Sequence, residues 1–194
     1  MNVLHLDTSA LGTYSISRQL TAAIVGQLQR DGVASSVSYR DLAAEPLPHW
    51  LPNPDPASDN ALRDEAVLQQ FLDADIVVLG APMYNFTITS QLKAWLDRVL
   101  VAGRTFRYGP NGPEGLAGGK RVIIASSRGG KYSEGPAAAM DFQEPYLRTV
   151  LGFIGITDVE FIRAEGVAMG DDAKQAALQA AHASIGQLAL RKAA

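Results

Sequence analysis

Short apolar runs alternate with segments of helical period along this chain, and that alternation constrains the fold more than any other feature. The interior of the run at 75–80 is apolar throughout, which is typical of a parallel strand covered on both faces. In the segment 15–30, by contrast, apolar residues recur every four positions, as on one face of a helix. Strands that alternate with helices predict a three-layer α/β fold with a parallel sheet.

The same patterns place the individual elements. Strands are expected at residues 3–7, 33–40, 75–80, 121–125 and 157–162. Helices are expected at 15–30, 61–72 and 90–101, around 147–154, and from Asp171 towards the basic pair Arg191 and Lys192. The proline-rich stretch 46–56 is predicted to be a loop, and the glycine-rich stretch 103–119 to hold a hairpin around 105–108. No boundary or repeat interrupts the pattern, so residues 1–194 are expected to form a single domain.

The composition removes most kinds of catalytic chemistry. The chain has no cysteine, which excludes disulfides, thiolate-held clusters and thiol catalysis, and its three histidines (His5, His49 and His182) lie far apart in the sequence. We therefore predict no metal site and no catalytic side chain, and any redox chemistry must depend on a bound organic cofactor. The net charge of −3 predicts neither a nucleic-acid nor a membrane partner. The start of the chain has no basic region and only a short apolar run, which favours a cytoplasmic protein.

Four common motifs are absent from the sequence. No two glycines have the spacing that begins G-x-G-x-x-G, and neither Gly119-Lys120 nor Gly130-Lys131 completes a Walker-A loop. Neither G-x-S-x-G nor H-E-x-x-H occurs. These absences exclude the common dinucleotide, hydrolase and zinc sites.

The residues that follow the first strand suit a phosphate group. Ligands of an open α/β sheet bind outside the carboxyl ends of its strands, so the loops at those ends are the candidates. The segment 8–18 is rich in Ser and Thr and leads into a helix, and the chain has no acidic residue from position 8 to 30. A helix N-terminus with hydroxyl donors binds phosphate monoesters, although Ser and Thr are also ordinary helix caps.

Two further loops suit a planar ring. Residues 81–86, after the third strand, offer apolar contacts and an amide to a heteroaromatic ligand, or simply cover the end of the strand. Residues 126–132, after the fourth strand, contain a glycine pair that lets the main chain approach a ligand closely or forms a plain turn. In the flavodoxin-like strand order 2-1-3-4-5, with helices on both faces of a five-stranded parallel sheet, all three loops open on one edge. We therefore predict an FMN site there.

At these positions the sequence resembles the family of FMN-dependent NADH-azoreductases, which are flavodoxin-like quinone and azo reductases. The resemblance covers nearly the whole chain. It is carried by Asp7-Thr8-Ser9 with Ser15-Ile16-Ser17-Arg18, by Pro82-Met83-Tyr84-Asn85-Phe86 running into Ser90-Gln91-Leu92-Lys93, by 105–108 with 112–116, by Ser127-Arg128-Gly129-Gly130, and by Pro145-Tyr146-Leu147 with 152–155.

The resemblance implies a flavin site and a homodimer whose second subunit helps to form it. By this resemblance, the FMN phosphate is held by Ser9, Ser15, Ile16 and Ser17, and the isoalloxazine ring by Met83, Tyr84, Asn85, Phe86, Ser127, Arg128, Gly129 and Gly130. The apolar stretch 151–156 is a candidate for the dimer interface or for the core. Thr89 stands where the family commonly has proline, and Tyr132 where it often has histidine, so a proton donor there would be a phenol. The resemblance leaves open whether Phe106 and Phe153 line the site.

The implied activity is that of an FMN-dependent NAD(P)H:quinone or azo-compound oxidoreductase. Hydride passes from NADH or NADPH to FMN, and the reduced flavin then reduces a quinone or an azo bond in the same place. Two other functions stay open: a flavodoxin-type electron carrier without its own substrate turnover, and a non-enzymatic sensor or scaffold. Flavodoxins are typically very acidic, and the net charge of −3 argues against a carrier. The sequence distinguishes neither NADH from NADPH nor the physiological acceptor.

Overall fold

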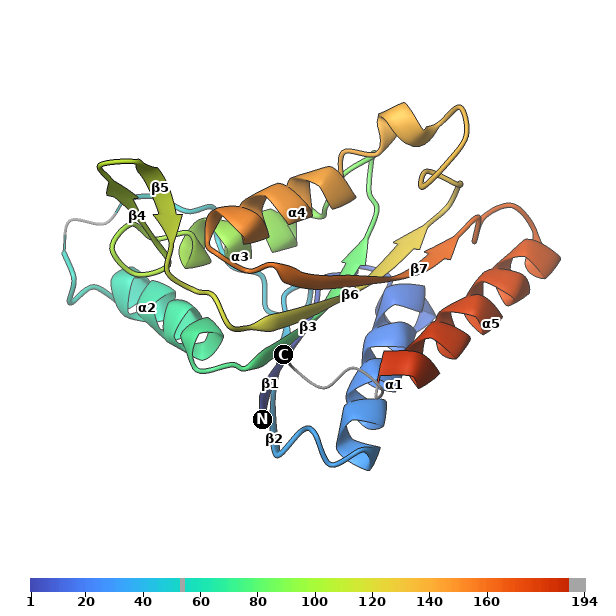
Figure 1. The fold of residues 1–194 in the computed structure, drawn as a ribbon, viewed down its shortest axis with the longest axis horizontal. Coiled ribbons are helices and arrows are strands. Elements are labelled where there is room, and N and C mark those ends of the chain that lie inside the picture. The colour runs from blue at the N-terminus through green and yellow to red at the C-terminus, as the bar shows by residue number, and fades with distance from the viewer. Residues whose placement is uncertain (53–54, 189–194) are drawn as a thin grey trace.

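The computed structural model describes residues 1–52 and 55–188, so Asn53, Pro54, Arg191 and Lys192 lie outside the described residues. A five-stranded parallel sheet lies at the centre, in the order β2-β1-β3-β6-β7. When only the strands of this sheet are counted, that is the predicted order 2-1-3-4-5. Helices cover both faces of the sheet (Figure 1), so the predicted flavodoxin-like fold class is confirmed.

Strands and helices alternate as the sequence predicted. The strands of the main sheet are β1 (Asn2–Asp7), β2 (Ser36–Asp41), β3 (Ile76–Pro82), β6 (Arg121–Arg128) and β7 (Asp158–Glu165). The helices are α1 (Ile16–Arg30), α2 (Asp59–Leu72), α3 (Ser90–Val99), α4 (Glu144–Phe153) and α5 (Asp171–Gln187), with short 3-10 helices η1 (Gly12–Tyr14) and η2 (Ala138–Met140). The predicted hairpin is formed by β4 (Phe106–Gly109) and β5 (Gly112–Gly115). Within the described residues, no helix is both long and apolar enough to cross a membrane.

Two hydrophobic cores, one on each face of the sheet, hold the layers together. Ile76 and Val78 of β3 belong to the core shared with α1 and α5, whereas Val77 and Leu79 belong to the core shared with α2, α3 and α4. Figure 1 shows α1 and α5 together on one side of the sheet. Successive side chains of a strand point to opposite faces, so a strand covered on both sides must be apolar at successive positions. This is why every residue of β3 is buried.

The second strand begins at Ser36 and not at residue 33 as predicted. Helix α1 closes at Gly32, whose φ is +68°, and the main-chain N–H groups of Val33 and Ala34 both donate to Leu28 O, at 2.9 and 3.0 Å. These bonds satisfy the end of the helix. Val33 and Ala34 therefore belong to the helix C-terminal turn, and strand pairing starts after them.

Three strands run past their predicted ends. β3 continues to Pro82, β6 to Arg128 and β7 to Glu165, because Pro82 pairs with Ser127 and Arg128 pairs with Glu165 in the sheet. Ser126, Ser127 and Arg128 are therefore strand residues, which corrects their predicted place in a loop. The local sequence becomes polar at these points, but the ladder of the neighbouring strand continues to supply hydrogen-bond partners.

Candidate functional site

The loops after β1, β3 and β6 meet at the carboxyl edge of the sheet. The Tyr84 hydroxyl lies 3.3 Å from Ser9 Oγ and accepts a hydrogen bond from the Ala10 N–H at 3.2 Å. The ring of Phe86 meets the ring of Tyr132 edge-on, with 6.1 Å between their centroids. The loop after β3 thus contacts both of the others, in the arrangement that the strand order predicted.

The N-terminus of α1 offers hydrogen-bond donors to an anion. Ser15 caps the helix by accepting the Arg18 N–H at 3.3 Å, and the hydroxyls of Ser15 and Ser17 lie 3.1 Å apart. The main-chain N–H groups of Ile16 and Ser17 have no acceptor in the described part of the chain. Such N–H groups, at the positive end of a helix dipole, suit a phosphate.

Arg18 secures the loop that precedes this helix. Its Nη2 and Nε donate to Ser9 O at 2.8 and 3.2 Å. Its Nη1 and Nη2 donate to the two carboxylate oxygens of Asp41 at 2.6 and 2.7 Å, a bidentate pair that fixes the plane of the guanidinium. The main chain at Ser9 is thereby tied to the carboxyl end of β2.

The carboxylate of Asp7 is buried behind this loop, and its neighbours offset its charge. Thr21 Oγ1 and Tyr39 OH donate to it at 2.8 and 3.1 Å, and Arg18 Nη1 lies 3.8 Å away. Burial raises the pKa of Asp7, but the interactions with His5, Thr21 and Tyr39 outweigh burial and hold that pKa below its ordinary value. Burial, with the Asp7 charge second, raises the pKa of Tyr39 to about 12. At neutral pH Asp7 is therefore ionised and Tyr39 is neutral.

The loop after β3 is a tight turn with backbone strain. Tyr84 and Thr87 exchange main-chain hydrogen bonds of 2.9 and 3.1 Å, and Asn85 and Phe86 between them have positive φ values of 48° and 71°. A positive φ is unfavourable for a bulky residue such as phenylalanine. The turn exposes both of these side chains at the sheet edge, with Met83 half-buried beside them. Strain of this kind concentrates at ligand sites.

Gly129 and Gly130 follow β6 directly and lie at the same edge. A Cβ atom on Gly130 would stand 3.2 Å from the ring of Tyr132, so the tyrosine packs closely over residue 130 and would have to shift for a larger residue there. Tyr132 is half-buried between Gly130 and Phe86. Its phenol therefore borders the predicted ring site.

The side chain of Arg128 is buried beneath the edge of the sheet. Its side chain is 0% exposed, and its guanidinium forms ion pairs with Asp141, Glu144 and Glu165 at 3.0, 2.7 and 3.1 Å. Its Nε also donates to Ser126 Oγ at 3.0 Å. All of the guanidinium is used inside the protein, so only the main chain of Arg128 is left for a ligand. The prediction that Arg128 helps to hold the ring therefore concerns its main chain.

The remaining predicted residues lie on the three loops or at the strand ends that carry them. Ser127 links two of the loops, since its carbonyl accepts the Met83 N–H at 2.8 Å. The residues that the structure brings to the edge are Ser9, Ser15, Ile16, Ser17, Met83, Tyr84, Asn85, Phe86, Ser127, Gly129 and Gly130, with Arg128 contributing its main chain.

Phe106 and Phe153 pack on each other, with 4.7 Å between ring centroids, and against the core on the side of α4. The hairpin that carries Phe106 lies near the end of α4, whereas the segment that contains η2 leads into its start (Figure 1). Both rings therefore belong to the packing of the hairpin. Among residues 1–52 and 55–188 there is no group of three or more metal-ligating side chains.

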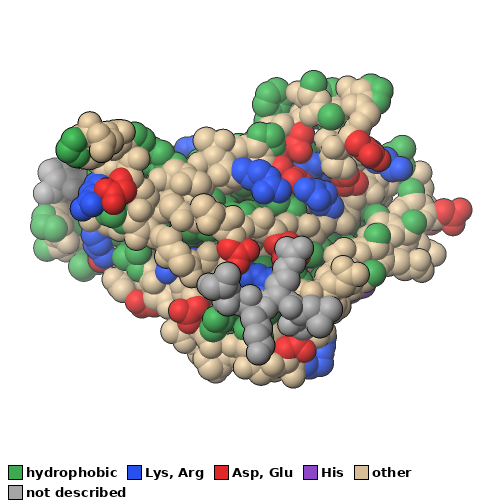
Figure 2. Space-filling view, in the orientation of Figure 1, with side chains coloured by type: hydrophobic (Ala, Val, Ile, Leu, Met, Phe, Trp, Pro, Cys, Tyr) green, Lys and Arg blue, Asp and Glu red, His purple; other side chains and the backbone are tan. Residues whose placement is uncertain are grey.

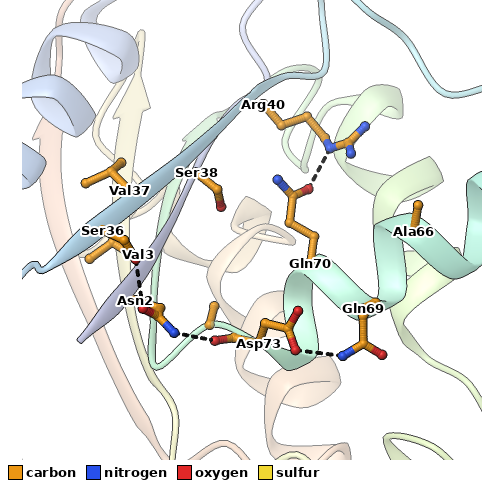
Figure 3. Close-up of a pocket in the computed structure, with 11 residues that line it drawn as sticks. Asn2, Val3, Ser36, Val37, Ser38, Arg40, Ala66, Gln69, Gln70 and Asp73 are labelled. Atoms are coloured by element: carbon orange, nitrogen blue, oxygen red, sulfur yellow. Dashed lines mark hydrogen bonds between the residues drawn. The ribbon is translucent and has the colours of Figure 1, made fainter.

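Two grooves differ in their relation to the edge. A groove of about 460 Å³ begins at the strained turn and is lined by Tyr84, Asn85, Thr87, Ile88, Thr89, Ser90, Lys93 and Tyr146. Another, of about 660 Å³, lies between the start of β1, β2 and α2 and contains none of the predicted site residues (Figure 3). There Arg40 donates to Gln70 at 2.9 Å, and Asn2 donates to Asp73 O at 3.3 Å. The first groove is the one that adjoins the candidate site.

Three polar residues of this region were not predicted. Asp41 and Glu165 end β2 and β7, the outer strands, and the carboxyl-edge rule extended to those strands would have pointed to both. Gln143 is fully buried, accepts from Ser126 Oγ at 2.9 Å and donates to Ala81 O at 3.0 Å. No pattern in the sequence marks it, because its partners Ala81, Ser126 and Arg128 are at least fifteen residues away along the chain.

The sequence and the structure are both similar to those of known proteins. The model of a family described as having a flavodoxin-like fold matches residues 1–189. An FMN-dependent NADH:quinone oxidoreductase of Sinorhizobium fredii is 57% identical over 198 residues, which cover 96% of each chain. FMN-dependent NADH:quinone oxidoreductase 1 of Xanthomonas euvesicatoria pv. vesicatoria is 58% identical over 191 residues, again 96% of each chain. The azoreductase structure from Bacillus anthracis str. Sterne superposes with a TM-score of 0.86 at 29% identity, covering 97% of this chain and 98% of its own.

Replacing Arg128 with methionine should lower the free energy of unfolding by about 3–5 kcal/mol, because largely buried carboxylates lose their shared cation. Arg107 is the matched control: it forms a bidentate pair with Glu114 at 2.7 and 3.0 Å, but the two side chains are 60% and 53% exposed. Arg107→Met should therefore change stability far less. Urea unfolding at neutral pH makes the comparison, and equal losses in the two variants would contradict the assignment.

Proposed function

This chain belongs to the flavodoxin-like family that includes the FMN-dependent NADH:quinone oxidoreductases, and we propose that it catalyses FMN-dependent hydride transfer from NADH to quinones and azo compounds. The observation that carries the proposal is that two loops able to hold a planar ring meet the N-terminus of α1, whose first N–H groups have no acceptor among residues 1–52 and 55–188. Residues 1–194 act in this proposal as a single FMN-binding domain.

The phosphate of FMN fits the N-terminus of α1. The N–H groups of Ile16 and Ser17 lack acceptors among the described residues, and the hydroxyls of Ser9, Ser15 and Ser17 lie on the same loop and first turn. A phosphate dianion needs several donors and a positive field, and both are present here. Arg18 fixes the loop beneath this site through its bonds to Ser9 O, while its own charge is paired with Asp41.

The isoalloxazine ring fits between residues 83–86 and the main chain of 127–130. When bound, FMN accepts a hydride from NADH and delivers reducing equivalents to the acceptor. In this proposal the chain binds and orients the ring, and the N–H groups of Gly129 and Gly130 would stabilise the negative charge of the reduced ring. Phe86 and Tyr132, which pack edge-on, would cover one side of the bound ring. No side chain of the site needs to change its own oxidation state.

The decisive experiment is spectroscopic. The purified protein, or the apoprotein titrated with FMN, should show flavin absorption that is bleached anaerobically by NADH and restored by a quinone, and NADPH should be compared with NADH. An azo dye in place of the quinone tests the second acceptor class. A colourless protein in which added FMN leaves NADH oxidation at background would overturn the proposal. Bleaching by dithionite but not by either nicotinamide nucleotide would instead indicate an electron carrier.

Ser15→Ala should weaken FMN binding more than it weakens the fold. Ser58 is the matched control, because it caps α2 by accepting the Ala61 N–H at 3.3 Å, the same distance as between Ser15 Oγ and the Arg18 N–H. Loss of either cap should reduce stability by about 1 kcal/mol. Only Ser15→Ala, better with Ser9→Ala added, should raise the FMN dissociation constant, by about tenfold or more for each lost donor to a charged phosphate. Equal FMN affinity in the two single variants would argue against the phosphate site.

We also infer a homodimer, supported by apolar side chains exposed around the site. Leu11, Tyr14 and Phe142 are 59%, 87% and 63% exposed, and hydrophobic side chains gather over the η2 segment (Figure 2). The stretch 151–156 contributes to the core, since Leu151, Ile154 and Ile156 are buried, and so the interface is not expected there. Sedimentation velocity should give a dimer at micromolar concentration, and a monomer would reject this inference.

The location of the protein is also a proposal. We infer that it works in the cytoplasm, because its proposed substrate NADH is kept inside the cell. The acceptors are small aromatic molecules, and the proposed reaction requires neither nucleic acid nor a membrane.

A further inference from the structure

We propose that Glu165 is a positioning residue for the flavin, because it fixes the main chain of Tyr132 and Ser133 and so the course of the loop 129–133 that carries the Gly129 and Gly130 N–H groups. The inference rests on the proposed function, since it concerns how this chain orients the loop toward FMN. It adds a residue from β7, a strand whose carboxyl end carries none of the predicted binding residues.

The Glu165 carboxylate accepts three hydrogen bonds from residues 129–133, the glycine loop. Its Oε1 accepts the N–H groups of Tyr132 and Ser133 at 2.9 and 3.0 Å, and its Oε2 accepts the Ser133 hydroxyl. Oε1 also accepts Arg128 Nη1 at 3.1 Å. A single side chain thus closes the loop from its far end and joins it to the residue at which the loop begins.

The turn that follows Glu165 holds the near end of the loop. The N–H groups of Gly166, Val167 and Ala168 donate to the carbonyls of residues 130, 128 and 129, at 2.9, 3.1 and 3.1 Å. Three consecutive carbonyls are therefore turned toward β7. The N–H groups of Gly129 and Gly130 have no acceptor among the described residues, which leaves them available to a ligand.

The hydrogen-bond donors around Glu165 favour the ionised form of its carboxylate. Its side chain is only 14% exposed, and burial raises its pKa. The hydrogen bonds from Ser133 and the Tyr132 N–H, together with Arg128, outweigh burial and hold the pKa below its ordinary value. The carboxylate is thus ionised at neutral pH, and its bonds to the loop are charge-assisted.

If Glu165 served only to neutralise Arg128, its removal would mainly destabilise the fold. Arg128 keeps Asp141 and Glu144 as partners when Glu165 is removed, so the buried cation stays neutralised. The bonds that are lost without replacement are those to Tyr132 and Ser133. Removal of Glu165 should therefore loosen the loop more than it destabilises the fold.

The test compares Glu165→Ala and Glu165→Gln with Glu160→Ala. Glu160 lies on the same strand and pairs with Arg121 at 3.0 Å at the other end of the sheet, so it controls for the loss of a partly buried carboxylate. The readouts are amide hydrogen exchange of the FMN-free protein, the FMN dissociation constant, and the midpoint potential of the bound FMN.

In Glu165→Ala, the amides of Tyr132 and Ser133 should exchange at least tenfold faster, and the FMN dissociation constant should rise at least tenfold. The midpoint potential should become more negative, because the loop is then held at one end only and the N–H groups of the glycine pair stabilise the reduced ring less. Glu165→Gln keeps an oxygen that can accept both N–H groups and should fall between Glu165→Ala and the wild type. If Glu165→Ala does not fold, the same three measurements on Glu165→Gln test whether Glu165 positions the loop. In Glu160→Ala, the exchange rates and the FMN dissociation constant should stay within twofold of the wild type. The midpoint potential should be unchanged.

The inference would be overturned if Glu165→Ala had the amide exchange rates, the FMN dissociation constant and the midpoint potential of the wild type. Equal changes in Glu160→Ala and Glu165→Ala would overturn it as well. If the wild type binds no FMN, the proposed function itself fails, together with the flavin-positioning role. Hydrogen exchange in the FMN-free protein would in that case still show separately whether Glu165 holds the loop.

Discussion

The parallel pairing of β1, β3 and β6 is the constraint on which the candidate site depends. β1 pairs with β3 and β3 with β6, all in the same direction, so their carboxyl ends reach the same edge of the sheet. The two central strands, β3 and β6, are buried at every residue, which fixes their register through the packing of both faces. Three loops that are far apart in the sequence are thereby set side by side, before any contact between them is made.

Different devices then hold the three loops on this rigid edge. Arg18 ties the first loop to Asp41, and the glycine loop is tied to Glu165, so each outer strand contributes one carboxylate. The loop between them relies on a strained turn at Asn85 and Phe86. Hydrogen bonds to charged groups are among the stronger ones in proteins, and they hold loops that have little apolar burial of their own. The polar groups thus determine local geometry, while the two hydrophobic cores supply the stability of the fold.

The fold could be predicted from the sequence because apolar period and strand burial are local signals. The apolar residues 76–79 indicate a strand covered on both faces, and the recurrence of apolar residues in 15–30 indicates a helix. The ends of the strands could not be predicted in this way, since β6 reaches Arg128 only because β7 pairs with it. The burial of Arg128 was missed for a related reason: its partners Asp141, Glu144 and Glu165 are distant along the chain, and only the tertiary structure brings them together.

The electrostatics of the edge follow from local arrangement more than from net charge. The chain carries a formal charge of −3, yet no acidic residue occurs from position 8 to 30, and the nearest carboxylate, Asp7, is offset by Arg18 and by donors from Thr21 and Tyr39. The charge of Arg18 is itself paired with Asp41, so the field at the N-terminus of α1 is set mainly by the helix dipole. This chain has no cysteine, and its histidines lie far apart in the sequence. It can still support redox chemistry if a bound cofactor carries the electrons, because its side chains then need only fix the position and charge of that cofactor.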